Sequence, residues 1–229
     1  MTRHVTSADG TRIAVERLGQ GPALVIVDGA GCSRLLGASR EWAPLLSRHF
    51  TVYIYDRRGR GESTDIAPYA VEREIDDLRA VIEVAGQAPY LVGCSTGAVL
   101  TRYAVEAGVA TSGVALFEPP LTTAADHRAP LVALLDAGEA SKAMVYWMTN
   151  VVGMPPSAAR AMRLFARRSW PLLLAAAPTL RYDLEILERG LAAPPPDIPA
   201  LPTLVLGQQG GRLEPEIAAS AITRFFAPG

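Results

Sequence analysis

A short motif in the first half of the chain has the residue types and spacing needed for nucleophilic catalysis. Residues 93–97 read Gly-Cys-Ser-Thr-Gly, directly after an apolar run that ends at Val92 and directly before the apolar stretch 98–107. In a G-x-S-x-G turn between a strand and a helix, the glycines allow a sharp bend that projects the serine. The Thr96 N–H begins the helix and could stabilise an oxyanion. We therefore predict Ser95 as a catalytic residue and Thr96 as a binding residue; the alternative is a turn without a chemical role.

A serine of this kind needs a base. Its hydroxyl is a poor nucleophile near pH 7 unless a neighbouring group removes its proton. The three histidines are His4, His49 and His127. His4 belongs to a predicted opening hairpin and His49 to the end of a predicted helix. His127 is therefore the candidate base, and its alternative is a solvated surface residue.

Asp28 is a second candidate for acid/base chemistry. It follows the apolar run 23–27 and precedes Gly29 and Ala30. A carboxylate shielded by apolar walls could have a raised pKa and act as a general acid or base. The alternative is an aspartate that accepts hydrogen bonds from backbone N–H groups of the loop 29–31.

The apolar pattern predicts the elements that must position these residues. The runs 23–27 and 51–55 are continuously apolar and rich in β-branched residues, as strands buried on both faces are. A helix over 40–50 joins them, and residues 70–85 carry the clearest amphipathic helix. Further strands are predicted at 90–92, 112–117 and 203–206, an antiparallel pair within 2–18, and a last helix at 214–226. The predicted fold class is α/β with a mostly parallel sheet.

From 121 to 190 the strand pattern disappears. Helices are predicted at 131–135, 140–152, 158–166 and 172–187, separated by glycine and proline. The simplest organisation is a core of residues 1–120 and 192–229 with an inserted helical cap at 121–191. Aromatic and methionine side chains in this segment, Trp147 and Met148 among them, should partly line a pocket for an apolar ligand.

Two further segments resemble the α/β-hydrolase superfamily. Residues 27–31, Val-Asp-Gly-Ala-Gly, follow the first buried strand, and residues 56–63, Asp-Arg-Arg-Gly-Arg-Gly-Glu-Ser, resemble the superfamily's Asp-x-Arg-Gly-x-Gly-x-Ser loop. With the motif at 93–97, the resemblance covers about residues 5–206. It implies a doubly wound sheet with the active site at the carboxyl ends of the strands. It also implies that the Gly29–Ala30 loop supplies a second oxyanion N–H, and that Glu118 stands where some haloalkane dehalogenases keep their acid.

The departures from this resemblance change the expected chemistry. Asp28 stands where the superfamily usually has histidine. The acid of the superfamily's triad usually follows the strand that matches 203–206, where this chain reads Gly-Gln-Gln-Gly-Gly at 207–211. In addition, no histidine follows His127 in the sequence. A deletion that spans the late histidine loop is the simplest account. We therefore expect a C-terminally shortened fold with a degenerate catalytic triad.

Three functions follow. The leading hypothesis is an enzyme that binds a hydrophobic carbonyl-bearing small molecule under the cap and performs cyclisation, elimination or isomerisation with Ser95, Asp28 and the oxyanion hole. The second is a serine esterase or lactonase completed by His127. The third is a ligand-binding descendant of a hydrolase without catalysis.

The net charge and the lengths of the apolar runs limit the kinds of partner that we expect for this chain. The net charge of −1 favours neither nucleic acid nor an anionic membrane, and no apolar run reaches the length of about 18 residues that a membrane span needs. The N-terminus has no apolar signal segment, so we expect a cytoplasmic protein. The cysteines, Cys32 and Cys94, are expected to be free thiols. We expect no metal or other cofactor, and a possible homodimer through an exposed sheet edge.

Overall fold

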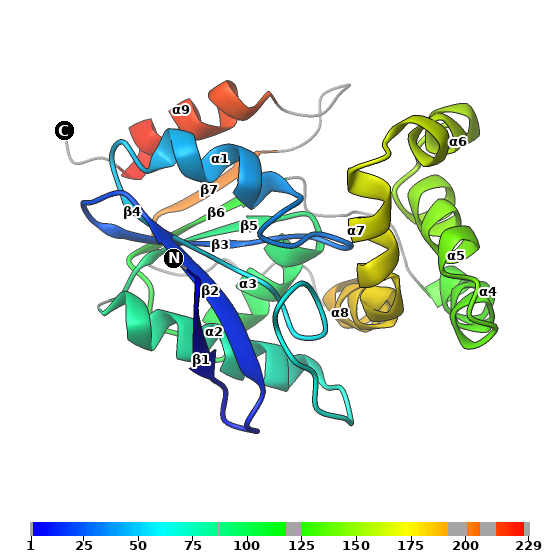
Figure 1. Ribbon diagram of the computed structural model, residues 1–229. Helices are drawn as coiled ribbons and strands as arrows, with labels where there is room; N and C mark the ends of the chain where they lie inside the picture. The colour runs from blue at the N-terminus through cyan, green and yellow to red at the C-terminus, as the bar shows by residue number, and fades with distance from the viewer. Residues whose placement is uncertain (1, 87, 118–124, 192–200, 207–213, 227–229) are drawn as a thin grey trace.

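A mostly parallel sheet forms the centre of the molecule. The computed structural model describes residues 2–86, 88–117, 125–191, 201–206 and 214–226 (Figure 1). Its strands are β1 (Thr2–Thr6), β2 (Arg12–Leu18), β3 (Ala23–Val27), β4 (Thr51–Tyr55), β5 (Tyr90–Cys94), β6 (Gly113–Phe117) and β7 (Thr203–Leu206). Within these ranges the sheet has the order β1-β2-β4-β3-β5-β6-β7. β1 and β2 pair antiparallel, β2 pairs antiparallel with β4, and all later pairs are parallel. The predicted α/β fold class is confirmed.

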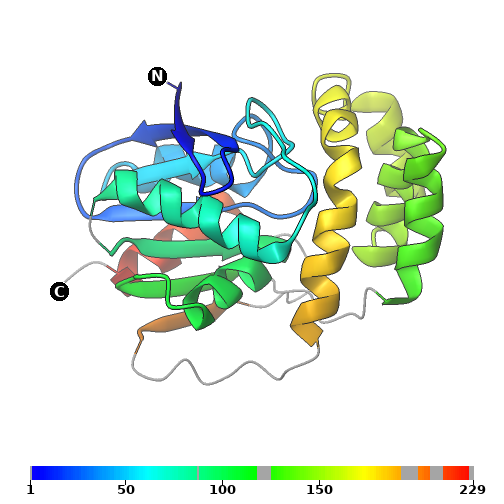
Figure 2. The same cartoon turned by 90° about the horizontal axis from the view of Figure 1, so that it is seen from below.

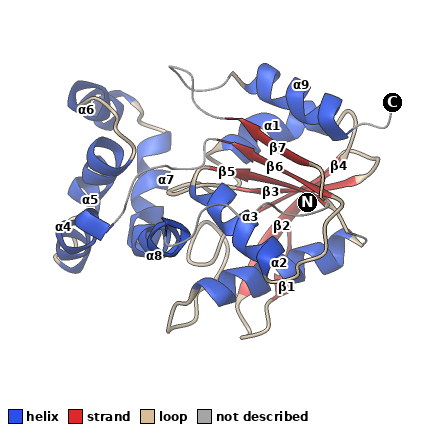
Figure 3. Cartoon of the chain, turned by 180° about the vertical axis from the view of Figure 1, so that it is seen from behind, coloured by secondary structure: helices blue, strands red, loops and turns tan. Residues whose placement is uncertain are grey.

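Alternating side chains of the central strands build one hydrophobic core on each face of the sheet. Val25 and Val27 pack with helices α2 (Val71–Ala85) and α3 (Thr96–Glu106). Leu24 and Ile26 face the other way and pack with α1 (Ala38–Leu46) and α9 (Pro215–Phe226). The two helical layers lie on opposite sides of the sheet in Figures 1 and 3. The continuous apolar runs in the sequence are explained by this burial on both faces.

The remaining helices form a group beyond one end of the sheet, which we call the helical block. It contains α4 (Ala125–Asp136), α5 (Ala140–Tyr146), α6 (Pro156–Phe165), α7 (Ser169–Ala176) and α8 (Leu180–Leu191). Figure 2 shows α8, in gold, between the sheet and the green helices α4 and α5. The block lies where a cap is expected. Segments 118–124 and 192–200, which would contain the domain boundaries, lie outside the described residues, so the division into core and cap stays a prediction.

The helical block also corrects two predicted helices. The segment 172–187 is not one helix, because α7 ends at Ala176, a short 3-10 turn covers Ala177–Thr179, and α8 begins at Leu180. Pro178 lies in that turn and has no N–H to continue the ladder. The segment 140–152 changes to a π-helical turn at Trp147–Val151. In the part of the chain that the structure describes, no helix is both long and apolar enough to cross a membrane.

Candidate functional site

Ser95 occupies a strained turn between β5 and α3. Its backbone has φ 54° and ψ −123°, and no other non-glycine residue in the described ranges has a positive φ. This backbone region costs an L-residue about 1–3 kcal/mol and persists only where surrounding structure enforces it. The Ser95 N–H donates to the Phe117 carbonyl at 2.8 Å, and the Ser95 carbonyl accepts from the Ala98 N–H at 2.9 Å. The predicted turn therefore exists, and its serine is half-buried.

The two glycines of the motif are required by close backbone approach. A Cβ on Gly97 would lie 2.2 Å from the Val27 carbonyl oxygen, and a Cβ on Gly93 would lie 2.6 Å from the Ala98 Cα. Both distances are far below any normal contact. Gly97 lets the first turn of α3 pack directly against the end of β3, and Gly93 lets α3 pack closely against β5. The contact at Gly97 brings the loop after β3 next to the serine.

That loop lies against Ser95 as the sequence predicted. A Cβ on Gly29 would lie 3.0 Å from the Ser95 Cβ and 3.6 Å from its Oγ. Gly29 therefore leaves room for the serine side chain, and Ala30 follows directly. Thr96 is buried at the start of α3. The loop and the helix start thus meet around Ser95, which is the arrangement an oxyanion hole made of the Ala30 and Thr96 N–H groups needs; their role as donors stays a prediction.

The Asp28 carboxylate contacts the start of α1. Its Oδ1 accepts a hydrogen bond from the Ser39 N–H at 3.1 Å, while its Oδ2 is buried and has no partner in the described part of the chain. The helix begins after Gly37, which has no side chain to cap it, so Asp28 satisfies a free N–H of the first turn. It is hydrogen-bonded neither to Ser95 nor to an amide of 29–31 among these residues. Its catalytic role stays a prediction.

Burial dominates the electrostatics of Asp28. It raises the pKa of this carboxyl from 3.8 to about 6, against the hydrogen bonds from Ser39 and the positive charges of Arg60 and Arg57. The carboxyl can therefore gain or lose a proton close to neutral pH, which is what a general acid or base needs.

This pKa predicts a pH-dependent stability that an asparagine should remove. The folded pKa lies above the unfolded one, so Asp28 contributes stability below about pH 4, and this stability is lost as the pH rises through about 6. A shift of this size corresponds to at most about 3 kcal/mol. In urea unfolding between pH 4 and 8, Asp28→Asn should lack this loss, since its amide oxygen still accepts from Ser39. The exposed Asp136→Asn should follow the wild type, and identical profiles for all three proteins would refute the assignment.

His127 lies in the helical block and contacts a neighbour there. It belongs to α4, and its Nδ1 lies 3.2 Å from the Tyr146 hydroxyl oxygen of α5. No hydrogen bond joins it to Ser95 within the described ranges. His4 lies on β1, with its Nε2 3.3 Å from the Glu62 carbonyl oxygen. His127 as a base for Ser95 therefore stays a prediction.

Apolar side chains of the helical block face the loop after β3. A Cβ on Gly31 would lie 3.4 Å from both the Met144 Cε and the Leu173 Cδ2. Trp147 and Met148 are buried in the same hydrophobic cluster as Met144. Two predicted site segments, Glu118 and the stretch 207–211, lie outside the described residues.

Sequence reasoning missed Asp183. This aspartate on α8 is fully buried, and its Oδ1 accepts hydrogen bonds from the Thr96 hydroxyl and from Arg57 Nη1, both at 2.8 Å. Its Oδ2 accepts from Arg60 Nη2 at 2.6 Å. Burial opposes its ionisation, but the arginine charges and these hydrogen bonds lower its pKa. The sequence did contain a signal for the burial of Asp183, though not for its partners. Asp183 follows Leu180 by three residues and so shares the apolar face of its helix.

Two arginines of 56–63 hold their loop to buried carboxylates of α2. Arg57 forms two hydrogen bonds with Glu74, at 2.7 and 2.6 Å, and Arg58 does the same with Asp77, at 2.8 and 2.7 Å. All four side chains are buried. Bidentate pairs of this kind fix planar groups firmly in place.

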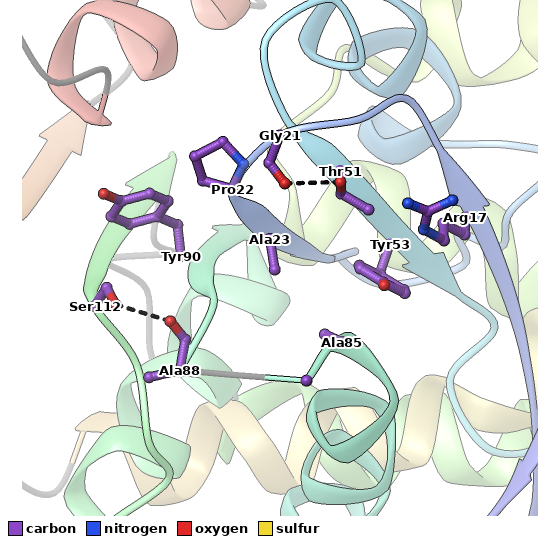
Figure 4. Close-up of a pocket in the computed structure, with 11 residues that line it drawn as sticks. Arg17, Gly21, Pro22, Ala23, Thr51, Tyr53, Ala85, Ala88, Tyr90 and Ser112 are labelled. Carbon is purple, nitrogen blue, oxygen red and sulfur yellow. Dashed lines mark hydrogen bonds between the residues drawn. The ribbon is translucent and has the colours of Figure 1, made fainter.

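A cavity of about 450 Å³ lies at the other end of the sheet (Figure 4). Its walls include Pro22, Thr51, Tyr90 and Ser112, which lie at or just before the starts of parallel strands. Two of the polar side chains here are already paired: the Thr51 hydroxyl donates to the Gly21 carbonyl and the Ser112 hydroxyl to the Ala88 carbonyl. Ser95 follows the end of β5, so this cavity is separate from the candidate site.

The chain belongs to the α/β-hydrolase family. It matches the sequence profile described as the Alpha/beta hydrolase family over residues 24–228. It is 35% identical to a solved α/β hydrolase from Sphaerobacter thermophilus, with a TM-score of 0.85, covering 98% of this chain and 100% of that one. The predicted resemblance is thus confirmed, and members of this family are typically enzymes.

More distant structures share the fold alone. The enol-lactonase from Burkholderia xenovorans is 18% identical with a TM-score of 0.69, covering 90% of this chain and 80% of that one. The bottromycin epimerase BotH is 22% identical with a TM-score of 0.61, covering 97% of this chain and 86% of that one. A curated protein of Mycobacterium tuberculosis, named Probable oxidoreductase EphD, is 40% identical over 90 residues, which are 36% of this chain and 14% of that protein. The chain thus spans a small part of this relative.

Proposed function

We propose that this protein is an enzyme that binds a hydrophobic carbonyl-bearing small molecule and performs non-hydrolytic acid/base chemistry on it: cyclisation, elimination or isomerisation. The observation that carries the proposal is Ser95, held in a strained turn next to Gly29, with no histidine hydrogen-bonded to it in the described part of the chain. In this proposal the turn positions a carbonyl oxygen, and no histidine of the described residues is hydrogen-bonded to Ser95 as the base of ordinary ester hydrolysis would be.

The Ala30 and Thr96 N–H groups bind the carbonyl oxygen of the substrate in this proposal. Their hydrogen bonds strengthen as negative charge develops on that oxygen, which lowers the barrier to removing a proton from the adjacent carbon. Ser95 Oγ hydrogen-bonds the same substrate and positions it. Asp28 exchanges the proton, since its pKa of about 6 allows both forms near neutral pH and its Oδ2 has no partner within the described ranges.

The substrate class follows from the surface that faces the loop after β3. Met144 and Leu173 lie 3.4 Å from the position a Cβ on Gly31 would take; both side chains are apolar, and the methionine is also flexible enough to adapt to a ligand. They favour a ligand with a hydrophobic body and a single polar group directed at Ser95. The fold itself does not select the chemistry, because an enol-lactonase and an epimerase share it.

Proton exchange in heavy water tests the proposal. In D₂O, hydrophobic ketones from a panel should take up deuterium next to the carbonyl in the presence of the protein, measured by mass spectrometry. Asp28→Ala should abolish the uptake. Asp28→Asn should abolish it if Asp28 transfers the proton, and should preserve part of it if Asp28 only donates a hydrogen bond. The exposed Asp136→Asn is the matched control and should behave as the wild type.

Ester hydrolysis provides the opposing measurement. Turnover of p-nitrophenyl acetate should stay close to the buffer rate, because no histidine of the described residues is hydrogen-bonded to Ser95. A turnover number near the enzyme median of about 10 s⁻¹ that disappears in Ser95→Ala would identify a serine hydrolase instead. Absence of both exchange and hydrolysis across the panel would contradict the proposed enzyme and favour a ligand-binding role.

A further inference from the structure

A buried polar network connects α8 of the helical block to both sides of the Ser95 site. On one side, the Thr96 hydroxyl donates to Asp183 Oδ1 at 2.8 Å. On the other side, Arg60 Nη2 donates to Asp183 Oδ2 at 2.6 Å, and Arg60 Nη1 donates to the Gly29 carbonyl at 2.7 Å. One carboxylate therefore reaches Thr96 directly and the loop 28–30 through a single arginine.

The residues of this network are buried, and their hydrogen bonds hold them in fixed positions. Asp183, Arg57 and Arg60 are each at most 2% exposed, so every one of these hydrogen bonds forms away from water. Arg57 adds a hydrogen bond to the Asp28 carbonyl at 3.4 Å and binds Glu74 of α2 through its other nitrogens. Charge-assisted hydrogen bonds in such surroundings are strong and directional. The positions of the loop carbonyls are thus tied to the position of α8.

The Gly29 carbonyl that Arg60 binds determines the direction of the neighbouring Ala30 N–H. The Gly29 carbonyl and the Ala30 N–H belong to the same peptide unit, so a hydrogen bond that fixes the carbonyl also fixes the direction of the N–H. Arg60 therefore orients the peptide that presents the Ala30 N–H. The Thr96 side chain is oriented by the hydrogen bond from its hydroxyl to Asp183, and the Thr96 N–H, in the first turn of α3, has no acceptor within that helix.

We propose that Asp183 is a positioning residue that holds both halves of the oxyanion hole, the Thr96 half directly and the Ala30 half through Arg60. The proposal rests on the proposed function in one respect, that the Ala30 and Thr96 N–H groups bind the oxyanion. It adds that the hole is complete only when α8 is seated against the sheet, because Asp183 comes from the helical block. Thr179, also in the block, supports this seat by accepting from Arg60 Nε at 2.9 Å.

The test removes one hydrogen bond and keeps the charges paired. Asp183→Asn alone is unsuitable because it leaves two buried arginines short of charge and could unfold the protein. Thr96→Val removes the hydroxyl at nearly constant volume, and Thr96→Ser restores it. Thr101→Val is the matched control, since Thr101 is also buried on α3 but donates to the Gly97 carbonyl, not to Asp183.

The probe is an alkyl fluorophosphonate, whose phosphoryl oxygen occupies the oxyanion hole when Ser95 Oγ displaces fluoride. Labelling is followed by intact mass from pH 5 to 9.5, a range that includes the ordinary histidine pKa and extends to high pH, where hydroxide takes up the serine proton even without a histidine. Thr96→Val should label about tenfold more slowly than the wild type, a fraction of what loss of a whole donor costs. Thr96→Ser should label within about threefold of the wild type and Thr101→Val within about twofold.

The two readouts of this experiment separate the two ideas. Equal labelling rates for Thr96→Val and the wild type overturn the positioning role, as does an equal slowing in Thr96→Ser or in Thr101→Val. The pH profile addresses the proposed function on its own. A rate that rises in proportion to hydroxide supports a serine without a histidine base. A plateau with a midpoint near the ordinary histidine pKa of about 6.5, lost in His127→Ala, indicates a hydrolase. In either case, the Thr96 ratio decides whether the Asp183–Thr96 hydrogen bond positions the oxyanion hole.

Discussion

Asp183→Ala should lower the free energy of unfolding by about 3–5 kcal/mol, the usual cost of removing one partner from a buried ion pair. The change leaves Arg60 with no carboxylate partner among the described residues and leaves Arg57 with Glu74 alone. Neither guanidinium can lose its proton to escape the cost. A domain of this size typically has 5–15 kcal/mol of stability, so this one substitution should remove a large part of it.

Glu188→Ala is the matched control for this prediction. Glu188 lies on the same helix and pairs with Arg128 of α4, but the two side chains are 26% and 42% exposed. Exposed pairs contribute about 0–1 kcal/mol, so this variant should unfold almost as the wild type does. Urea unfolding of the three proteins at pH 7 measures the difference. A cost below about 1 kcal/mol for Asp183→Ala would show that α8 does not depend on the network.

The central sheet could be predicted because its pattern is local. The runs 23–27 and 51–55 are strands with the predicted bounds, since a strand buried on both faces is apolar along its length. The run 203–206 is also a strand with the predicted bounds, although it lies at the edge of the described sheet and Val205 is 57% exposed. The breaks between helices of the helical block were harder to predict from the sequence than these strands. Pro178 separates α7 from α8, yet the segment around it stays apolar, and an apolar pattern alone does not distinguish one bent helix from two.

The candidate site also has one part that local sequence predicts and another part that it does not. Ser95, Thr96 and the Gly29 loop lie within 93–97 and 27–31, and turn chemistry at such short range can be derived from residue types. Asp183 lies 87 positions after Thr96, and no local pattern announces a contact at that distance. Asp28 was placed in the right loop, but its carboxylate faces Ser39 of α1, because the uncapped start of that helix offers a free N–H. Such partner choices depend on tertiary packing.

Gly97→Ala should strongly destabilise the protein, by about 3 kcal/mol or more, at the upper end of overpacking costs. Helix propensity alone predicts the opposite sign, since alanine in a helix is favoured over glycine by about 1 kcal/mol. Packing decides, because the new Cβ would lie 2.2 Å from the Val27 carbonyl oxygen and 2.6 Å from that of Asp28, and both are backbone atoms that cannot rotate away. Relief requires α3 to move away from β3, which would also separate Ser95 from Gly29.

Gly138→Ala is the control for Gly97→Ala. The φ of Gly138 is 72° and no atom lies within 4 Å of its Cβ position, so this variant should lose only the cost of a left-handed residue, about 1–2 kcal/mol. Thermal unfolding compares the three proteins, and a Gly97→Ala variant that melts at or above the wild-type temperature would show that the turn holding Ser95 is not built by this contact.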